Sequence, residues 1–240
     1  MNDDRDPGAP AAPLPPGEPH AGQARGDRLH TFAGPGITVS WSRARCIHVA
    51  ACVFGLPRVF APGRRPWVDP SQSSADDIAR VVQHCPTGAL HFAREDGGAV
   101  EVAPEVNLVA VTRNGPIHLR GAIEVFDESE RRLLTDTRVA LCRCGRTSNP
   151  PLCDGTHTVV GFQDEGNLRL ESVVDRPVAV RGALRVRPER GGPLHLAGPF
   201  RLQSADHHVA LPCDAAKLCR CGGSGNKPFC DGTHRTRTPG

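Results

Sequence analysis

Apolar and polar residues alternate in short stretches along most of the chain, and one stretch repeats at helical spacing. Residues 37–41, Ile-Thr-Val-Ser-Trp, alternate as a half-buried strand does. From Ala75 to residue 83 or 84, apolar side chains recur at i, i+3, i+4 and i+7, which predicts a helix capped by a preceding serine. The last apolar position of this pattern is Cys85, so we expect it to be delivered from the buried face. Residues 89–92 predict another strand.

The second half of the chain reads as short strands punctuated by Gly and Pro, and its pattern occurs twice. Residues 115–121, GPIHLRG, align without a gap with residues 192–198, GPLHLAG, at an offset of 77 residues. The simplest explanation is a β-rich unit that has been duplicated within the chain. The boundary between the two copies is expected between Gly161 and Gly166.

These patterns predict an α+β protein with four segments. Residues 1–29 are rich in Pro and Gly with almost no apolar content, so we expect a disordered tail. Residues 30–97 form a small unit that combines strands with the predicted helix. Residues 98–165 and 166–240 are the two β-rich copies.

Composition favours small units held together by metal. The chain has eight Phe, two Trp and no Tyr, against 26 Gly and 23 Pro, so large apolar anchors for one extensive core are few. The net charge of +3 comes from scattered basic residues, which argues against a nucleic-acid partner.

The ten cysteines are interpreted through the expected compartment. The N-terminal sequence is acidic and Pro-rich, without the basic and apolar regions of a signal peptide. No stretch approaches the ~18 consecutive apolar residues of a membrane span. We therefore expect a cytoplasmic protein with no membrane partner, in which clustered cysteines bind metal rather than form disulfides.

One pattern of four metal-ligating residues occurs twice at a fixed offset. Each copy has the form C-x-C-x8-C-x3-H, and eleven of the sixteen positions are identical. The members are Cys142, Cys144, Cys153 and His157, and then Cys219, Cys221, Cys230 and His234. A C-x-C pair can bind one ion while the third Cys and the His bind a second, as a [2Fe–2S] cluster requires. A single tetrahedral zinc in a structural module that mediates protein contacts is the alternative.

Both copies resemble the CDGSH iron–sulfur domain of the mitoNEET family. The first copy has Thr147, Pro151 and Cys-Asp-Gly-Thr-His at 153–157, and the second has Ser224, Pro228 and the same five residues at 230–234. The resemblance implies a [2Fe–2S] cluster in each loop. Two motifs in one chain resemble the monomeric tandem class, in which the two copies would pack about a pseudo-two-fold axis.

The histidine ligands predict the chemistry of these two sites. Replacing a thiolate by a neutral imidazole makes a cluster less negative and easier to reduce, and the imidazole can take up a proton near neutral pH. We therefore expect electron transfer or cluster transfer, with a redox partner or a cluster-acceptor protein. No catalytic set of side chains stands out, so we expect a carrier rather than an enzyme, which could serve a separate redox enzyme.

A third site is predicted near the N-terminus. Cys46, Cys52 and Cys85-Pro86 fit the first, third and distal positions of the bacterial ferredoxin pattern C-x2-C-x2-C with a distal C-P, while Val49 occupies the second. Residues 36–93 resemble divergent mono-cluster ferredoxin domains, which implies a [4Fe–4S] cluster. The missing thiolate makes [3Fe–4S] an equal alternative.

The surroundings of this third site are predicted from neighbouring residues. His48 is either a fourth ligand or a surface side chain. Apolar cover that excludes water is expected from four residues, namely Val53, Phe54, Leu56 and Phe60.

Other residues of the repeat have weaker predictions. Arg143 and Arg220 lie between the paired cysteines and are expected at a cluster sulfur, against an acidic partner, or on a solvated face. His118 and His195 correspond to each other and are expected on the strand surface, with a place near a cluster as the alternative. Cys213 corresponds to Asp136, so the repeat does not predict it as a ligand.

Overall fold

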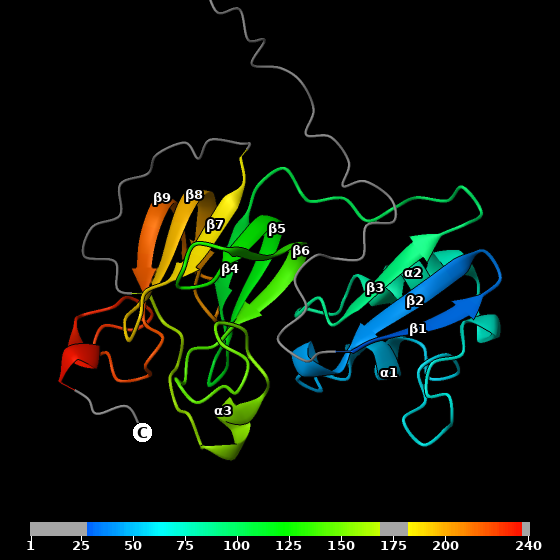
Figure 1. Ribbon diagram of the computed structural model, residues 1–240, viewed down its shortest axis with the longest axis horizontal. Coiled ribbons are helices and arrows are strands. Elements are labelled where there is room, and N and C mark those ends of the chain that lie inside the picture. The colour runs from blue at the N-terminus through cyan, green and yellow to red at the C-terminus, as the bar shows by residue number, and fades with distance from the viewer. Residues whose placement is uncertain (1–27, 169–181, 237–240) are drawn as a thin grey trace, which may run out of the picture.

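The computed structural model describes residues 28–168 and 182–236, and it is mostly β with few helices. A three-stranded sheet with two α-helices lies beside a larger β assembly of six strands (Figure 1). The expected disordered tail falls largely outside the described residues. Leu29, which we assigned to that tail, is instead the first residue of a strand, because it pairs with Ser42.

The N-terminal unit is an antiparallel sheet in the order β1-β2-β3, with helices packed against it. Its elements are β1 (Leu29–Gly34), β2 (Ile37–Ser42), the 3-10 turn η1 (Arg43–Arg45), α1 (Ala51–Gly55), the 3-10 turn η2 (Pro70–Gln72), α2 (Ala75–Val82) and β3 (Leu90–Arg94). The predicted strands and helix are thus found, with their ends moved by one or two residues.

Helix α2 forms where the apolar spacing and the N-cap agree. The side chain of Ser74 accepts a hydrogen bond from the backbone N–H of Asp77 at 3.2 Å, which satisfies one of the free donors of the first turn. The face with Ile78, Val81 and Val82 is buried against the sheet. This packing places the end of the helix, and therefore Cys85, beside β3.

The second body contains six strands that join the two copies of the repeat. They are β4 (Leu108–Val111), β5 (Ile117–Phe126), β6 (Arg132–Leu141), β7 (Leu184–Pro188), β8 (Leu194–Gln203) and β9 (Ala210–Leu218). The order is β4-β5-β7-β8-β9, with β6 on β5 and a further pairing of β4 with β8.

The pairings in this body recur after a shift of 77 residues. Strand β4 pairs antiparallel with β5 of its own copy and parallel with β8 of the other copy. Strand β7 pairs antiparallel with β8 and parallel with β5. The registers correspond as well, since Leu108 faces Arg201 and Arg185 faces Glu124. Each copy therefore completes the other's sheet, and the core is built from both copies together.

That core is aliphatic and spans both copies. Strand β5 alternates between buried and less buried positions along its length, as one buried sheet face requires. Its buried members include Ile117, Leu119 and Ile123, which pack in one cluster with Leu194 and Phe200. One shared core explains how units with few aromatic residues can fold.

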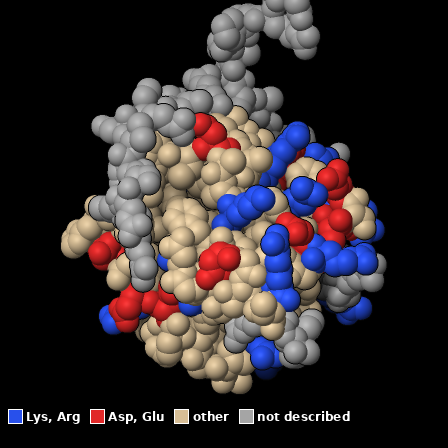
Figure 2. All heavy atoms as spheres, turned by 90° about the vertical axis from the view of Figure 1, so that its left-hand side faces the viewer, with Lys and Arg blue, Asp and Glu red and all other residues tan. Residues whose placement is uncertain are grey.

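The outer surface carries mixed charge. On the side of the molecule that Figure 2 faces, Lys and Arg side chains lie among Asp and Glu. Ion pairs link such residues on β7, as between Arg185 and Glu124 at 3.0 Å and between Arg187 and Glu130 at 3.1 Å. Within the described ranges, no helix has the length and apolar character needed to cross a membrane.

Candidate metal centres

The first ligand loop continues β6 beyond its last residue. Leu141 forms a β-bridge with Leu152, and the backbone N–H groups of Cys142 and Cys153 donate to Pro151 and Ala140, each at 2.9 Å. The two arms of the loop are therefore held side by side. The arms carry the two halves of the donor set, with Cys142 and Cys144 on one and Cys153 on the other.

The four side chains of this loop are arranged as two pairs. The Sγ atoms of Cys142 and Cys144 are 3.7 Å apart, and Sγ of Cys153 lies 3.3 Å from Nδ1 of His157. Two thiolates on one tetrahedral ion, each ~2.3 Å from it, would be ~3.8 Å apart, and a sulfur and an imidazole nitrogen ~3.5 Å apart. Each pair thus has the spacing of two ligands of one ion.

The second ligand loop repeats this geometry after β9. Cys219 and Cys221 have their Sγ atoms 3.8 Å apart, and Sγ of Cys230 lies 3.3 Å from Nδ1 of His234. Leu218 bridges Phe229 as Leu141 bridges Leu152. A backbone N–H, that of Gly223, also donates to the sulfur of Cys221 at 3.4 Å.

The Asp-Gly pair after the third cysteine shapes the turn that returns the histidine. One carboxylate oxygen of Asp154 accepts from the backbone N–H of Thr156 at 3.0 Å, and the other accepts from the N–H of Ser148 at 2.8 Å. Gly155 has φ +89°, a conformation that favours glycine. These hydrogen bonds shape the turn that brings His157 back to Cys153.

The number of donor side chains that meet at one point bears on the kind of metal site that each loop can form. Within residues 28–168 and 182–236, no three His, Cys, Asp or Glu side chains converge on a single ion position. A tetrahedral zinc needs four such donors around one point. In both loops the closest contacts join the donors two by two, one Cys–Cys pair and one Cys–His pair.

The donor side chains of the first loop differ in their proton affinities. The hydrogen bond between the two thiols lowers the pKa of Cys142 to about 6 and raises that of Cys144. Burial raises the pKa of Cys153 to about 11 and lowers that of His157. Metal binding at this site must release protons and will depend on pH.

The two loops differ in exposure. In the first loop all four ligand residues are buried, His157 being 9% exposed. In the second loop only Cys219 is buried, whereas Cys221, Cys230 and His234 are half-buried. The second site therefore faces solvent more openly than the first.

The two loops also touch each other. A Cβ built on Gly145 would lie 3.0 Å from the carbonyl oxygen of Cys221, and one built on Gly222 would lie 3.0 Å from that of Cys144. A cavity of about 780 Å³ opens between the loops, with Cys144, Cys221 and His234 in its wall.

The three N-terminal cysteines come from three neighbouring segments. Cys46 ends η1, Cys52 lies in α1, and Cys85 follows α2. Burial and the nearby Cys85 and Cys46 raise the pKa of Cys52 to about 11. The pKa of Cys85 is lowered in spite of burial, because the hydroxyl of Thr87 and the guanidinium of Arg138 stabilise the thiolate. Cys46 and Cys85 thus both lie near enough to Cys52 to raise the pKa of its thiol.

Other expectations for this site are only partly met. His48 is exposed and has φ +58°, and Val49 is 51% exposed at the position of the missing cysteine. Phe60 is fully buried, but Phe54 is 84% exposed. The expectation that Phe54 covers the site is wrong, because α1 turns this residue outward.

The N-terminal loop lies against the first CDGSH-like loop. A Cβ on Gly155 would lie 3.7 Å from Cα of Ile47, the residue after Cys46. In addition, the side-chain amide of Asn149 donates to the carbonyl of Ala44 at 3.1 Å. The first loop thus touches both the N-terminal loop and the second loop.

Two of the three roles expected for Arg143 are wrong. Arg143 is 1% exposed, so neither a solvated face nor a partner contact is possible for it. It donates to the carbonyls of Gly115 at 2.9 Å and Thr112 at 2.5 Å, pairs with Asp164, and stacks over the ring of Phe162 at 5.0 Å. Arg143 therefore anchors the first ligand loop to the segments that contain Thr112, Gly115 and Asp164.

The repeated histidines differ between the copies. His118 is half-buried, and its buried Nε2 has no hydrogen-bond partner among the residues that the structure describes. Burial lowers its pKa to about 4, and His157 adds to this effect. The surface role expected for His118 is therefore wrong, and the alternative near the first site is favoured. His195 instead pairs with Glu189 at 2.7 Å.

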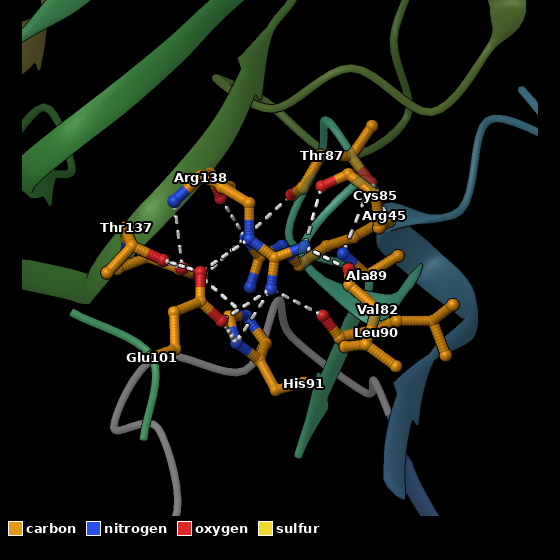
Figure 3. Close-up of polar contacts among 11 residues, drawn as sticks. Arg45, Val82, Cys85, Thr87, Ala89, Leu90, His91, Glu101, Thr137 and Arg138 are labelled. Carbon is orange, nitrogen blue, oxygen red and sulfur yellow. Dashed lines mark hydrogen bonds and ion pairs between the residues drawn. The ribbon is translucent and has the colours of Figure 1, made fainter. Parts of the chain in front are cut away.

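Sequence reasoning missed a charged cluster behind the N-terminal site (Figure 3). We call this set the interdomain cluster, and its members are Arg45, His91, Glu101, Asp136 and Arg138. One signal could have revealed it. At the positions that correspond to Asp136 and Arg138, the second copy has Cys213 and Ala215, so the copies differ where charge is buried.

Comparison with known proteins assigns both parts of the chain. Residues 32–95 match the family model described as a divergent 4Fe-4S mono-cluster, and residues 114–158 and 175–235 match that described as an iron-binding zinc finger of CDGSH type. The uncharacterized protein YjdI of Escherichia coli K12 is 33% identical over 61 residues, which are 25% of this chain and 80% of that protein. The YjdI protein of E. coli O157:H7 matches to the same extent. No solved structure matches this chain.

Proposed function

We propose that this chain, which belongs to the CDGSH-type iron-binding proteins, is a multi-centre electron carrier. The proposal also takes into account its divergent 4Fe-4S mono-cluster domain. In this proposal the two CDGSH loops hold one [2Fe–2S] cluster each, and the N-terminal loop holds a [4Fe–4S] or [3Fe–4S] cluster. The protein would pass electrons and carry out no substrate chemistry of its own.

The paired donors carry the proposal. In both CDGSH loops a Cys–Cys pair at 3.7 or 3.8 Å lies beside a Cys–His pair at 3.3 Å. This favours two ions per loop over the single zinc of a structural module. At the N-terminus, Cys46, Cys52 and Cys85 supply three thiolates, and the fourth position is left to water or another ligand.

The contacts between loops support a linear order of the three sites. Ile47 meets Gly155, and Gly145 meets Cys221, so the first CDGSH site lies between the other two. Loops in contact keep the distance between their centres short. We therefore propose that electrons pass between the N-terminal and second CDGSH sites by way of the first.

The histidine ligands would tune this transfer. Nδ1 of His157 and of His234 points toward a ligand cysteine, which leaves Nε2 of each ring free of the metal. A neutral imidazole in place of a thiolate makes a centre easier to reduce, and its outer nitrogen can couple reduction to protonation. The partner would be a redox protein that docks near the more open second site.

The shared core supports a duplicated origin and a tandem arrangement within one chain. Equivalent strand pairs recur in equivalent registers at an offset of 77 residues. We propose that the two CDGSH units arose by internal duplication and that one chain supplies both halves. The N-terminal unit would be a small ferredoxin-like unit. All ten cysteines are described and none forms a disulfide, which supports a reducing compartment such as the cytoplasm.

Cluster transfer is the second candidate, and the exposure of the second site favours it. Cys221, Cys230 and His234 are half-buried, whereas their counterparts in the first loop are buried. A histidine ligand that can be protonated is the natural point of release. If the chain donates clusters, an acceptor protein should draw [2Fe–2S] from the second site before the first, as followed by visible absorption.

Anaerobic purification with elemental and spectroscopic analysis tests the main proposal. We expect a coloured protein with about seven or eight iron atoms per chain and matching acid-labile sulfide. Electron paramagnetic resonance should resolve two [2Fe–2S] signals and one from a larger cluster. A colourless protein with two zinc ions and no sulfide would refute the electron-carrier function and support the structural zinc module.

A further inference from the structure

The outward face of β6 is buried, whereas the equivalent face of β9 is not. Asp136 and Arg138 are 1% and 2% exposed because the N-terminal unit covers them. Their counterparts in β9 are Cys213, which is half-buried, and Ala215, which is exposed. Only the first CDGSH unit therefore presents a charged pair to the N-terminal unit, and the two copies are chemically distinct at this face.

Arg138 reaches across the interface to the backbone that carries Cys85. Its Nη1 donates to the carbonyl oxygens of Val82 at 2.6 Å and Cys85 at 2.8 Å, and its Nη2 donates to that of Leu90 at 2.8 Å (Figure 3). Val82 is the last residue of α2, where carbonyl groups lack partners within the helix. The guanidinium thus satisfies these groups and fixes the turn between α2 and β3.

Asp136 holds the segment on the other side of the same site. One of its carboxylate oxygens accepts from Nη2 of Arg45 at 2.7 Å and lies 3.1 Å from Nε2 of His91. Nη2 of Arg45 also donates to the carbonyl oxygens of Thr87 at 2.7 Å and Arg138 at 2.9 Å. Arg45 immediately precedes Cys46, so the position of this ligand depends on a residue of β6.

The remaining charges of the interdomain cluster complete the arrangement. Glu101 pairs with Nε of Arg138 at 2.7 Å and lies 3.4 Å from Nδ1 of His91. Gly88 allows the close approach, because a Cβ there would lie 2.3 Å from both the carbonyl oxygen of Arg138 and Nη2 of Arg45. A buried charge is costly unless it is paired, so removing one member of this cluster leaves its partner in an unfavourable state.

We propose that Arg138 and Asp136 of the first CDGSH unit are positioning residues of the N-terminal metal site. They hold the backbone of Cys85 and the segment before Cys46, so the three thiols keep their arrangement only while β6 is docked. This inference rests on the proposed function for the presence of a cluster at Cys46, Cys52 and Cys85. It rests on the structure alone for the placement of the two loops.

Variants of Arg138 in the full-length chain test the proposal. In Arg138→Ala we expect loss of the three or four iron atoms of the N-terminal site, while both [2Fe–2S] signals remain. Arg138→Lys keeps the charge but not the fork of donors, so iron should dissociate from this site about 10- to 100-fold more readily. The matched control is Arg132→Ala on the same strand, whose side chain is 58% exposed. It should behave as the parent protein.

Hydrogen exchange supplies a second readout that needs no metal. Amide protons of residues 84–91 should exchange at least tenfold faster in Arg138→Lys and Asp136→Asn than in the parent, with residues 142–157 unchanged. If Arg138→Ala does not fold, Arg138→Lys decides the matter. If the parent holds the N-terminal cluster, unchanged iron retention in Arg138→Lys would overturn the proposal, and so would unchanged exchange of residues 84–91.

The two claims can fail separately. If the parent protein holds no iron at Cys46, Cys52 and Cys85, the proposed function fails for that site. Faster exchange of residues 84–91 in the variants would then still support positioning by β6. If the parent holds the cluster and the variants hold it equally well, the positioning role fails and the electron-carrier function stands.

Discussion

Gly145 and Gly222 occupy the same position in the two CDGSH loops, and each lies against the backbone of the other's loop. A Cβ on either would lie 3.0 Å from a cysteine carbonyl oxygen across the contact, that of Cys221 or Cys144. Both glycines have positive φ, +77° and +74°. The contact joins two loops whose donors belong to different metal sites. A substitution at either glycine should therefore alter the backbone of both sites.

Replacing Gly145 with alanine should disturb both CDGSH sites. The left-handed conformation alone costs roughly 1–2 kcal/mol for a residue with a Cβ, and the contact with Cys221 adds about 1 kcal/mol. The matched control is Gly191→Ala, because Gly191 has φ +63° but a Cβ built there would have no described atom within 4 Å beyond its chain neighbours. Anaerobic denaturation should show the larger loss for Gly145→Ala. Equal losses would mean that the loop contact contributes nothing.

Arg143 and Arg220 correspond in the repeat but should differ in their effect on stability. Arg143→Ala removes a buried guanidinium and leaves Asp164 and two carbonyls without it, which should cost about 3–5 kcal/mol. Arg220→Ala removes one good hydrogen bond, to the carbonyl of Glu189 at 2.8 Å, and should cost about 1 kcal/mol. Free energies of unfolding from denaturant titrations check this. A larger loss for Arg220→Ala would contradict the anchoring role of Arg143.

Exchanging the histidine ligands for cysteine should change the redox behaviour of the CDGSH sites. Each substitution, His157→Cys or His234→Cys, adds one negative charge to the centre and removes its titratable nitrogen. We expect the reduction potential of the altered site to fall by roughly 100 mV or more and its pH dependence to flatten. Potentiometric titration at several pH values measures both. Each single variant serves as the control for the other, because only one of the two waves should move.

The stability of the interdomain cluster should depend on the charge of His91. Burial alone would lower the pKa of His91, but the facing carboxylates of Asp136 and Glu101 outweigh burial and the repulsion of Arg138, so its pKa is raised. The folded state then binds the proton more tightly than the unfolded chain. The stability that protonated His91 contributes is fully present below the ordinary histidine pKa of about 6.5, and it is lost as pH rises through the pKa that His91 has in the folded protein.

Unfolding experiments across this pH range test the role of His91. The parent protein should lose stability as pH rises above neutrality, and part of that loss should be absent in His91→Gln. Arg45 and Arg138 remain charged throughout, so they add no pH dependence here. Glu101 has the opposite pH dependence. Burial alone would raise its pKa, but His91 and Arg138 hold that pKa at about 2. The stability that ionised Glu101 contributes is therefore lost as pH falls through that value. Identical pH profiles for parent and His91→Gln would exclude the proposed effect.

The elements that sequence patterns predicted best are those set by neighbours along the chain. Ser74 caps α2, and the apolar spacing of residues 78–82 faces the core, because both depend on the local period of the helix. The donor loops are local as well, since ligand, turn and ligand lie within sixteen residues. The sequence predicts the ends of strands less exactly. It does not reveal that Leu29 belongs to a strand or that Phe54 is exposed, because strand pairing and the orientation of a helix depend on contacts with residues elsewhere in the chain.

The sequence by itself determined which residues can bind metal and that the pattern occurs twice, because donor type and spacing are written in consecutive residues. Only the tertiary structure decided how the two copies complete one sheet, that Arg143 is an anchor, and that Arg138 of β6 supports the backbone of Cys85. Those relationships join residues dozens of positions apart. Their physical cause is the need to pair buried charges and backbone groups across an interface, which no local pattern reveals.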